Sequence, residues 1–218
     1  MLPPELAGLC FVDTSSGSDA ALAERAAAAV PGGRWMLLGA SRPGLIRALA
    51  AAGLDVVVVD SSRTALRRTR AALGDDSGAL LLAADPRELE IPGGVDAMLV
   101  PSAVWHAVLL SPDRRHVLRG MSKELRAGGL LLLELERLPE PPASEEPVPS
   151  GFGGVLWRRS ASEGFVEVRS GDVSVTFAMF SPEEAIAEAR DEGFEHVSPT
   201  AAGASVVWAS LRTTEGRA

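Results

Sequence analysis

Residues 35–44 read Trp-Met-Leu-Leu-Gly-Ala-Ser-Arg-Pro-Gly, and this stretch decides the fold. Four apolar residues end at Gly39, which indicates a short buried strand. From Pro43 to Ala52 the chain consists mostly of helix formers, and a proline suits the first turn of a helix because its missing N–H is not needed there. Gly53 suits the end of that helix. The stretch therefore predicts a strand, a glycine turn and a helix.

The same alternation continues along the chain. The β-branched run 56–59 ends at Asp60 and predicts a second buried strand, followed by a helix that begins after Ser61 or Ser62 and ends at Leu73. Three more strands are expected over residues 79–83, 96–100 and 130–135, with a helix over 113–126 before the last of them. Strands that alternate with helices predict a parallel sheet covered on both faces.

The C-terminal part does not continue the alternation of strands and helices. Residues 136–151 contain five prolines and four acidic residues, which excludes a helix or a central strand. We expect a solvated loop there, with a lid over a binding site as the alternative. Residues 154–159, 165–169 and 173–180 alternate like antiparallel strands. A proline and a capping-box acid after Ser181 predict a further helix, and residues 205–211 predict a last strand.

Composition favours one domain. The chain has 218 residues, of which 46% are hydrophobic, so it can bury one sizeable core. We expect a single domain over residues 1–218, with a helical N-terminal segment at residues 1–33 and the proline-rich loop at residues 136–151. Cys10 is the only cysteine and the three histidines are scattered, so neither a disulfide nor a metal site is expected.

Charge and hydropathy limit the classes of binding partner that we expect. The formal net charge of −8 disfavours a nucleic-acid partner, and the arginines over residues 63–70 are interpreted as a solvated helix face. The N-terminus does not have the pattern of a secretion signal, and no apolar run approaches the ~20 residues that a membrane span needs. We expect a cytoplasmic protein without a membrane partner, and a homodimer is compatible with the sequence.

Four residues share a position that indicates a binding site. Gly39, Asp60, Asp85 and Pro101 each fall at or just past the end of an expected strand. Open parallel sheets bind ligands beyond the carboxyl ends of their strands, where the strand order reverses. We therefore expect a ligand at this edge of the sheet.

The order of these motifs resembles the class I S-adenosylmethionine-dependent methyltransferases. The resemblance rests on Asp60, which lies 21 residues after Gly39, on Ala84-Asp85-Pro86, and on the helix, Gly-Gly turn and strand of residues 118–135. It covers about residues 19 to 212. It implies a Rossmann-like three-layer αβα fold with a doubly wound, mostly parallel seven-stranded sheet and a reversed last strand. It also implies S-adenosylmethionine as cofactor.

The resemblance also implies which residues bind that cofactor. Asp60 would accept hydrogen bonds from the ribose hydroxyls, and Asp85 would contact the adenine amino group. The full expected set is Gly39, Ala40, Ser41, Asp60, Ser61, Asp85, Pro86 and Pro101. Structural alternatives stay open, because Asp60 could cap the next helix and Asp85 could be an ordinary turn acid, while Asp96 is interpreted as structural.

The glycine loop departs from the family pattern, which is acidic-x-Gly-x-Gly-x-Gly. Leu37 stands at the acidic place, and Gly39, Ser41 and Pro43 stand at the glycine places. Ser41 and Pro43 would narrow the space for the methionine part of the cofactor, and Leu37 removes a carboxylate. A relative that has lost methyl transfer is therefore an alternative function.

Substrate contacts are expected from Trp105, His106, Phe152 and Trp157, although the aromatic residues could equally be core. His106 is the candidate catalytic base if the acceptor must lose a proton, and the alternative is a histidine at the start of a helix, half in solvent. The segment Val100-Pro101-Ser102-Ala103 is not Asn-Pro-Pro-Tyr, which argues against amino methylation of bases or glutamine.

We therefore expect a small-molecule methyltransferase and keep two alternatives. Gly39-x-Ser41-x-x-Gly44 can also be interpreted as a variant of the dinucleotide motif, with Asp60 holding the ribose of NAD in an oxidoreductase. The chain has no tyrosine, however, and so no Tyr-x-x-x-Lys pair. The other alternative is the non-catalytic relative.

Overall fold

The computed structural model describes residues 19–40, 42–74, 77–136, 156–159, 165–170, 173–201 and 206–213. A seven-stranded sheet forms its centre, with strand order β3-β2-β1-β4-β5-β10-β9. The strands are β1 (Arg34–Leu38), β2 (Asp55–Asp60), β3 (Leu80–Ala83), β4 (Val95–Val100), β5 (Leu125–Glu136), β9 (Phe194–Ala201) and β10 (Val206–Thr213). The first five are parallel, and β10 runs antiparallel to both β5 and β9. The predicted doubly wound sheet with a reversed last strand is confirmed.

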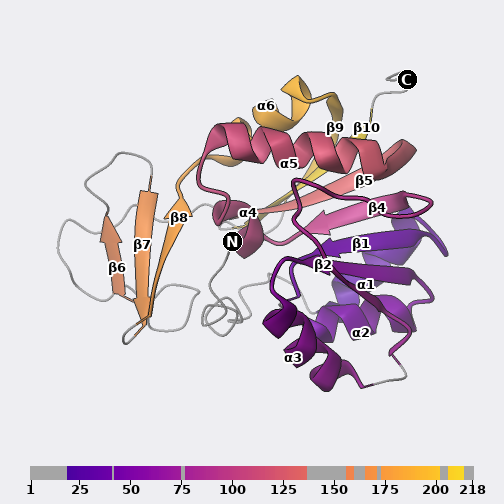
Figure 1. Cartoon of the computed structure of the whole chain (residues 1–218). Helices are drawn as coiled ribbons and strands as arrows, with labels where there is room; N and C mark the ends of the chain where they lie inside the picture. Colours follow the sequence, from indigo (N-terminus) through magenta and orange to yellow (C-terminus); the bar gives the residue numbers. More distant parts are fainter. Residues whose placement is uncertain are drawn as a thin grey trace.

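Helices cover both faces of this sheet (Figure 1). One layer consists of α1 (Asp19–Ala29), α2 (Pro43–Ala51) and α3 (Arg63–Leu73), and the other of α4 (Ser102–His106), α5 (Ser111–Glu124) and α6 (Pro182–Asp191). Strand β1 shows why both layers form. Met36 and Leu38 face the layer of α5, whereas Trp35 and Leu37 face the layer of α1 and α2. A parallel strand buried on both faces needs such a continuous apolar run.

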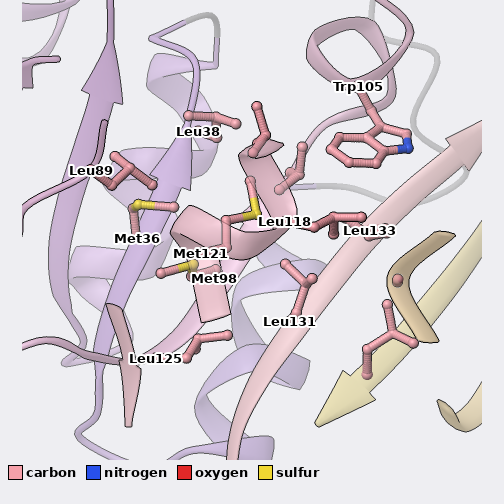
Figure 2. Close-up of a cluster of buried hydrophobic side chains, with 14 of the residues drawn as sticks. Met36, Leu38, Leu89, Met98, Trp105, Leu118, Met121, Leu125, Leu131 and Leu133 are labelled. Atoms are coloured by element: carbon pink, nitrogen blue, oxygen red, sulfur yellow. The ribbon is translucent and has the colours of Figure 1, made fainter. Parts of the chain in front are cut away.

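The larger core lies between the sheet and α5. Figure 2 shows Met36 and Met98 of the sheet close to Leu118 and Met121 of the helix. All four side chains are fully buried. The unbranched methionines suit an irregular gap between a twisted sheet and a helix, because three rotatable bonds let them adapt.

A second, three-stranded sheet follows β5 in the sequence. It consists of β6 (Leu156–Arg159), β7 (Phe165–Ser170) and β8 (Val173–Ala178), and both pairings are antiparallel as predicted. Figure 1 shows it apart from the large sheet, on the side where β4 ends and α4 begins. The backbone oxygen of Ala178 lies 2.8 Å from Nδ1 of His106, which joins the end of β8 to α4.

The sequence failed to predict two elements. Strand β9 contains Pro199 and several polar residues, so its pattern does not alternate, and it pairs with β10 alone. Helix α4 has five residues, which is too short for a helical period to show. Helix α5 ends at Glu124 rather than 126, because Leu125 already pairs with Val95 and the register then shifts. The loop was predicted over residues 136–151, but Glu136 is the last residue of β5. Residues 137–151 and residues 1–18 lie outside the described ranges.

In the described part of the chain, no helix is long and apolar enough to cross a membrane. Within the same part, no group of three or more His, Cys, Asp or Glu side chains could hold a metal ion.

The core makes a direct stability prediction. Leu118→Ala removes a fully buried side chain from α5 and should lower the free energy of unfolding by about 2–5 kcal/mol, because a cavity remains. Leu110→Ala is the matched control, since Leu110 is 54% exposed just before the same helix and should change stability by less than about 0.5 kcal/mol. Urea unfolding followed by circular dichroism measures both. Equal effects of the two substitutions would contradict the position of α5.

Candidate functional site

The structure brings the four expected strand-end residues to one edge of the sheet. Gly39 follows β1, Asp60 ends β2, Asp85 follows β3 and Pro101 follows β4. Strand β1 pairs with β2 on one side and with β4 on the other, so the order of the sheet reverses at β1. This carboxyl edge is therefore the place where a doubly wound sheet binds its ligand.

The loop after β1 is fixed by hydrogen bonds from its neighbours. Gly39 has φ of 88°, which a residue with a side chain rarely adopts, and its N–H donates to the backbone oxygen of Val59 at 2.7 Å. Ala40 is buried, and its backbone oxygen accepts a hydrogen bond from the hydroxyl of Thr69 in α3. Ser41 lies outside the described residues.

Asp60 connects the loops that follow two neighbouring strands. Its Oδ2 accepts a hydrogen bond from the N–H of Ala40 at 2.8 Å, and its Oδ1 accepts one from the N–H of Ser62 at 2.7 Å. The side chain that caps α3 belongs to Ser62, whose Oγ accepts a hydrogen bond from the N–H of Ala65. Asp60 thus holds the loop geometry, and a carboxylate has further lone pairs for a ligand. Ser61 is half-buried beside it.

Asp85 lies in a turn with its own partner. Its carboxylate accepts a hydrogen bond from the N–H of Arg87 and pairs with the guanidinium of the same residue, with Nη2 at 2.6 Å from Oδ2. The Arg87 guanidinium lowers the pKa of Asp85 from 3.8 to about 2. Asp85 is therefore ionised at neutral pH at the carboxyl edge, and Pro86 is half-buried beside it.

Asp96 is structural, as the sequence indicates. It is the second residue of β4, at the opposite edge of the sheet from Pro101. Its Oδ2 accepts a hydrogen bond from the N–H of Arg34 at 2.8 Å, which lowers the pKa of Asp96, and its other oxygen pairs with Arg126. Asp96 therefore links the amino end of β4 to those of β1 and β5.

Three charged residues at the carboxyl edge were not predicted. Arg42 is the N-cap residue of α2 and pairs with Asp19 of α1 and with Glu134 of β5. Glu134 is buried, and its Oε2 accepts a hydrogen bond from the N–H of Ser102 at 3.1 Å. We call Asp19, Arg42 and Glu134 the charge chain. The polar Glu134 within the apolar run of β5 is the signal that could have indicated it.

Leu37 contributes no charge at this edge. It is 1% exposed and packs with the residues of α1 and α2. Its side chain is part of the core on the side of α1 and α2.

The other expected substrate residues differ in their positions. Trp105 is 0% exposed and belongs to the core, and His106 is 2% exposed at the end of α4, so the expectation of a half-exposed histidine at a helix start is wrong. Phe152 lies outside the described residues, as does the side chain of Trp157 in β6.

His106, Phe180, Arg114 and Glu188 form a row of contacting side chains, which we call the column. The ring of His106 stacks on Phe180 with the ring centroids 4.3 Å apart, and the guanidinium of Arg114 lies 4.6 Å from the centroid of Phe180. Arg114 also forms two hydrogen bonds of 2.8 Å with Glu188 of α6. Because a carbonyl can only accept, the contact with Ala178 makes Nδ1 of His106 the protonated nitrogen. The column joins α4, α5 and α6.

Comparison with known proteins agrees with this geometry. Residues 38–133 match the model of a methyltransferase domain family. No curated protein matches the chain significantly. Residues 38–133 are therefore similar to a methyltransferase domain, and the predicted resemblance to the class I S-adenosylmethionine-dependent methyltransferases is confirmed.

Solved structures show the same fold. An S-adenosylmethionine-dependent methyltransferase from Clostridium acetobutylicum has a TM-score of 0.73 and 13% identity, with 96% of each chain covered. The CcbJ methyltransferase from Streptomyces caelestis has a TM-score of 0.71 and 14% identity, also with 96% of each chain covered. CalS10 from Micromonospora echinaspora, an amino pentose methyltransferase solved with bound S-adenosylmethionine, has a TM-score of 0.67 and 21% identity, with 98% of each chain covered.

The pairing of Asp85 with Arg87 predicts a pH dependence. A folded-state pKa of about 2 lies below the ordinary 3.8, so the ion pair contributes stability above about pH 4 that is lost as the pH falls towards 2. Asp85→Asn should therefore reduce the stability difference between pH 5 and pH 3, and Arg87→Gln should reduce it similarly. Urea midpoints across this range measure the effect. If the wild type and both variants have parallel pH profiles, the ion pair does not exist in solution.

Proposed function

We propose that the protein is an S-adenosylmethionine-dependent methyltransferase that acts on a small molecule. The methyltransferase domain of residues 38–133 supports the reaction class. The carboxyl edge supports the cofactor, because the acceptor oxygens of Asp60 and Asp85 suit the hydroxyls and amino group of an adenosine.

The observation that carries the proposal is an acid at the N-terminus of α2. A Cβ added to Gly44, in the first turn of α2, would lie 2.5 Å from Oδ2 of Asp19, so this carboxylate stands against the turn. Dinucleotide-binding folds place a pyrophosphate at the same helix end. This carboxylate is paired with the guanidinium of Arg42, the N-cap residue of α2, so the helix end already carries an ion pair. The acid of this pair suits a cofactor whose sulfonium and ammonium groups make it a cation.

The loop after β1 also favours a methyltransferase over a dinucleotide-binding protein. The N–H of Ala40, which a phosphate would need, is already bonded to Asp60. This donor is therefore not available to a phosphate of a dinucleotide. This favours a methyltransferase over the NAD-dependent oxidoreductase.

When bound, the cofactor would supply a methyl group on a sulfonium for transfer to a nucleophilic acceptor. The protein's own contribution is to position the reactants. Asp60 binds the ribose and Asp85 the adenine. The loop at Ala40 is held from both sides by Asp60 and Thr69, so the site is fixed before binding. The role of His106 as general base stays a prediction. Its ring is buried.

The proposed acceptor is a small molecule. The net charge of −8 disfavours nucleic acids. The structurally similar CalS10 is an amino pentose methyltransferase and MtfA is a glycopeptide N-methyltransferase, which supports an acceptor of this size class. The small β6–β8 sheet lies on the side of the carboxyl edge, where an acceptor must approach. The homodimer and the cytoplasmic location stay predictions.

Calorimetric titration tests the proposed function. We expect binding of S-adenosylmethionine and S-adenosylhomocysteine, and no binding of NAD. Binding of NAD alone would support the oxidoreductase, and binding of none of the three would support the relative without methyl transfer, for which Leu37 argues.

The role of Asp60 in cofactor binding is tested by the isosteric substitution Asp60→Asn. Asp60→Asn keeps one acceptor oxygen but removes the charge, and it should weaken S-adenosylhomocysteine binding by about 1.5–3 kcal/mol, the value of a charge-assisted hydrogen bond. Asp55→Asn is the matched control, because Asp55 begins the same strand at the opposite edge and is paired with Arg34. Equal affinities for the two variants would remove Asp60 from the site.

A further inference from the structure

The outer edge of the large sheet is a strand without the usual protection. Among the described residues, β3 pairs with β2 alone, and its sequence Leu-Leu-Leu-Ala contains neither a charge nor a proline. Leu80, its first residue, is 46% exposed. Proteins commonly protect an edge strand with charged residues, a proline or a bulge, because its unpaired backbone groups can bind another strand. The β3 edge is therefore open to an added strand.

The unpaired backbone groups of this edge follow from the pairing of β3 with β2. Ala83 lies opposite Asp60, and the N–H of Ala84 donates to the backbone oxygen of Asp60. Successive residues of a strand direct their N–H and C=O groups to opposite sides. The groups of Leu81 and Ala83 therefore point away from β2, and two residues offer both a donor and an acceptor to another strand.

Helix α3 carries a row of positive charges. The sequence indicates a solvated face over residues 63–70, and the structure divides its arginines between two flanks of the helix. Arg63, Arg67 and Arg70 are exposed and follow one another at spacings of four and three residues, so they share one flank. We call them the arginine stripe. Helix α3 contains no acid, and within the described residues none of the three forms an ion pair.

The neighbours of α3 place the arginine stripe at the β3 edge. Helix α2 packs on β2, whereas α3 packs on both β2 and β3, so α3 is the outer of the two helices. Its other flank faces α2, because Arg47 of α2 donates to the backbone oxygen of Ala72. The arginine stripe is on the flank away from α2, which is the side of the open edge.

The two faces of the β3 edge differ in character. Leu81 packs in the core on the side of α1 and α2, whereas Leu82 packs against the core on the side of α5. Leu80 shares the face of Leu82, because side chains alternate along a strand. An added strand would have one row of side chains beside the arginine stripe and the other row beside Leu80. A segment in which acidic and apolar residues alternate fits both rows.

We propose that the β3 edge binds an extended acidic segment of a partner protein, which adds a strand to the sheet. Its backbone pairs with Leu81 and Ala83, and its acidic side chains lie along the arginine stripe. Charge complementarity supports this occupant, because the stripe places three positive charges together on a chain whose net charge is −8. The inference goes beyond the proposed function and does not depend on it.

The same charges disfavour a second copy of this chain as the occupant. Two β3 edges that pair about a two-fold axis would form one continuous sheet, with both α3 helices on the same face. The two arginine stripes would then lie next to each other, and juxtaposed like charges oppose association.

The probe for this site is a fluorescein-labelled peptide of about ten residues in which glutamate and valine alternate, the pattern of a strand that is added to a sheet edge. Fluorescence polarisation measures its binding to the full chain. We expect saturable binding that weakens as the salt concentration is raised, because exposed charges are screened. The same peptide with lysine in place of glutamate should not bind.

The arginine stripe is tested by replacing its three residues together, as Arg63→Gln, Arg67→Gln and Arg70→Gln. This variant should bind the glutamate peptide about 3-fold to 100-fold more weakly, the combined value of three exposed ion pairs. Arg68→Gln is the matched control, because Arg68 is exposed on the same helix but lies four residues before Ala72, on the flank of α2. It should change the affinity by less than about 2-fold.

Strand pairing is tested from both partners. Ala83→Pro removes an N–H that points away from β2, which an edge strand tolerates, so it should weaken peptide binding at least about 10-fold with an unchanged circular dichroism spectrum. A glutamate peptide with an N-methylated backbone keeps its charges but has no N–H to donate, and it should not bind. This second measurement leaves the protein unaltered, so it does not depend on how well the proline variant folds.

The outcomes decide the proposal. Binding of the glutamate peptide that is reduced by the triple substitution and by N-methylation would support it. Equal binding of the N-methylated peptide would overturn strand addition, since charge alone would then hold the peptide. Equal binding of the lysine peptide, or no binding of the glutamate peptide, would also overturn the proposal. None of these outcomes changes the expectation for cofactor binding at the carboxyl edge.

Discussion

The carboxylate of Asp60 is the constraint on which the carboxyl edge depends. It ends β2 and bonds the N–H of Ala40 after β1 and the N–H of Ser62 before α3. One side chain therefore fixes two loops, at the point where the strand order reverses. Without it, the amide of Ala40 would need another acceptor, since buried N–H groups are almost always paired. The same interaction occupies the N–H of Ala40, which is then not available to a phosphate.

The site that results is acidic and preformed. Asp60 ends β2 and Asp85 follows β3, whereas the charge chain joins the start of α1, the N-cap of α2 and β5. Each acid is held by a backbone N–H or by an arginine. Such a site suits a cationic ligand whose parts include hydroxyls, an amino group and a zwitterion. The charge argument is independent of the family match, and both favour the same class of cofactor.

The sequence predicted the sheet well and the site only in part. Continuous apolar runs such as 56–59 identify buried parallel strands, and a residue at the end of such a run must lie at the carboxyl edge. Asp60 and Asp85 could therefore be placed. The charge chain could not, because Arg42 and Glu134 are 92 residues apart and meet through the pairing of β1 with β4 and of β4 with β5.

The other features that the sequence did not predict also depend on contacts between distant segments. The burial of His106 depends on Phe180 and Ala178, which arrive from the far end of the small sheet. Strand β9 pairs with β10 alone, so its sequence does not need to alternate or to be apolar. Local patterns predict what local geometry requires, whereas contacts between distant segments need the assembled fold.

A crystal structure of the protein with S-adenosylhomocysteine would show whether Asp60 holds the ribose. We expect the ribose hydroxyls within hydrogen-bond distance of the Asp60 carboxylate. A ligand bound elsewhere, or a ribose turned away from Asp60, would contradict this expectation.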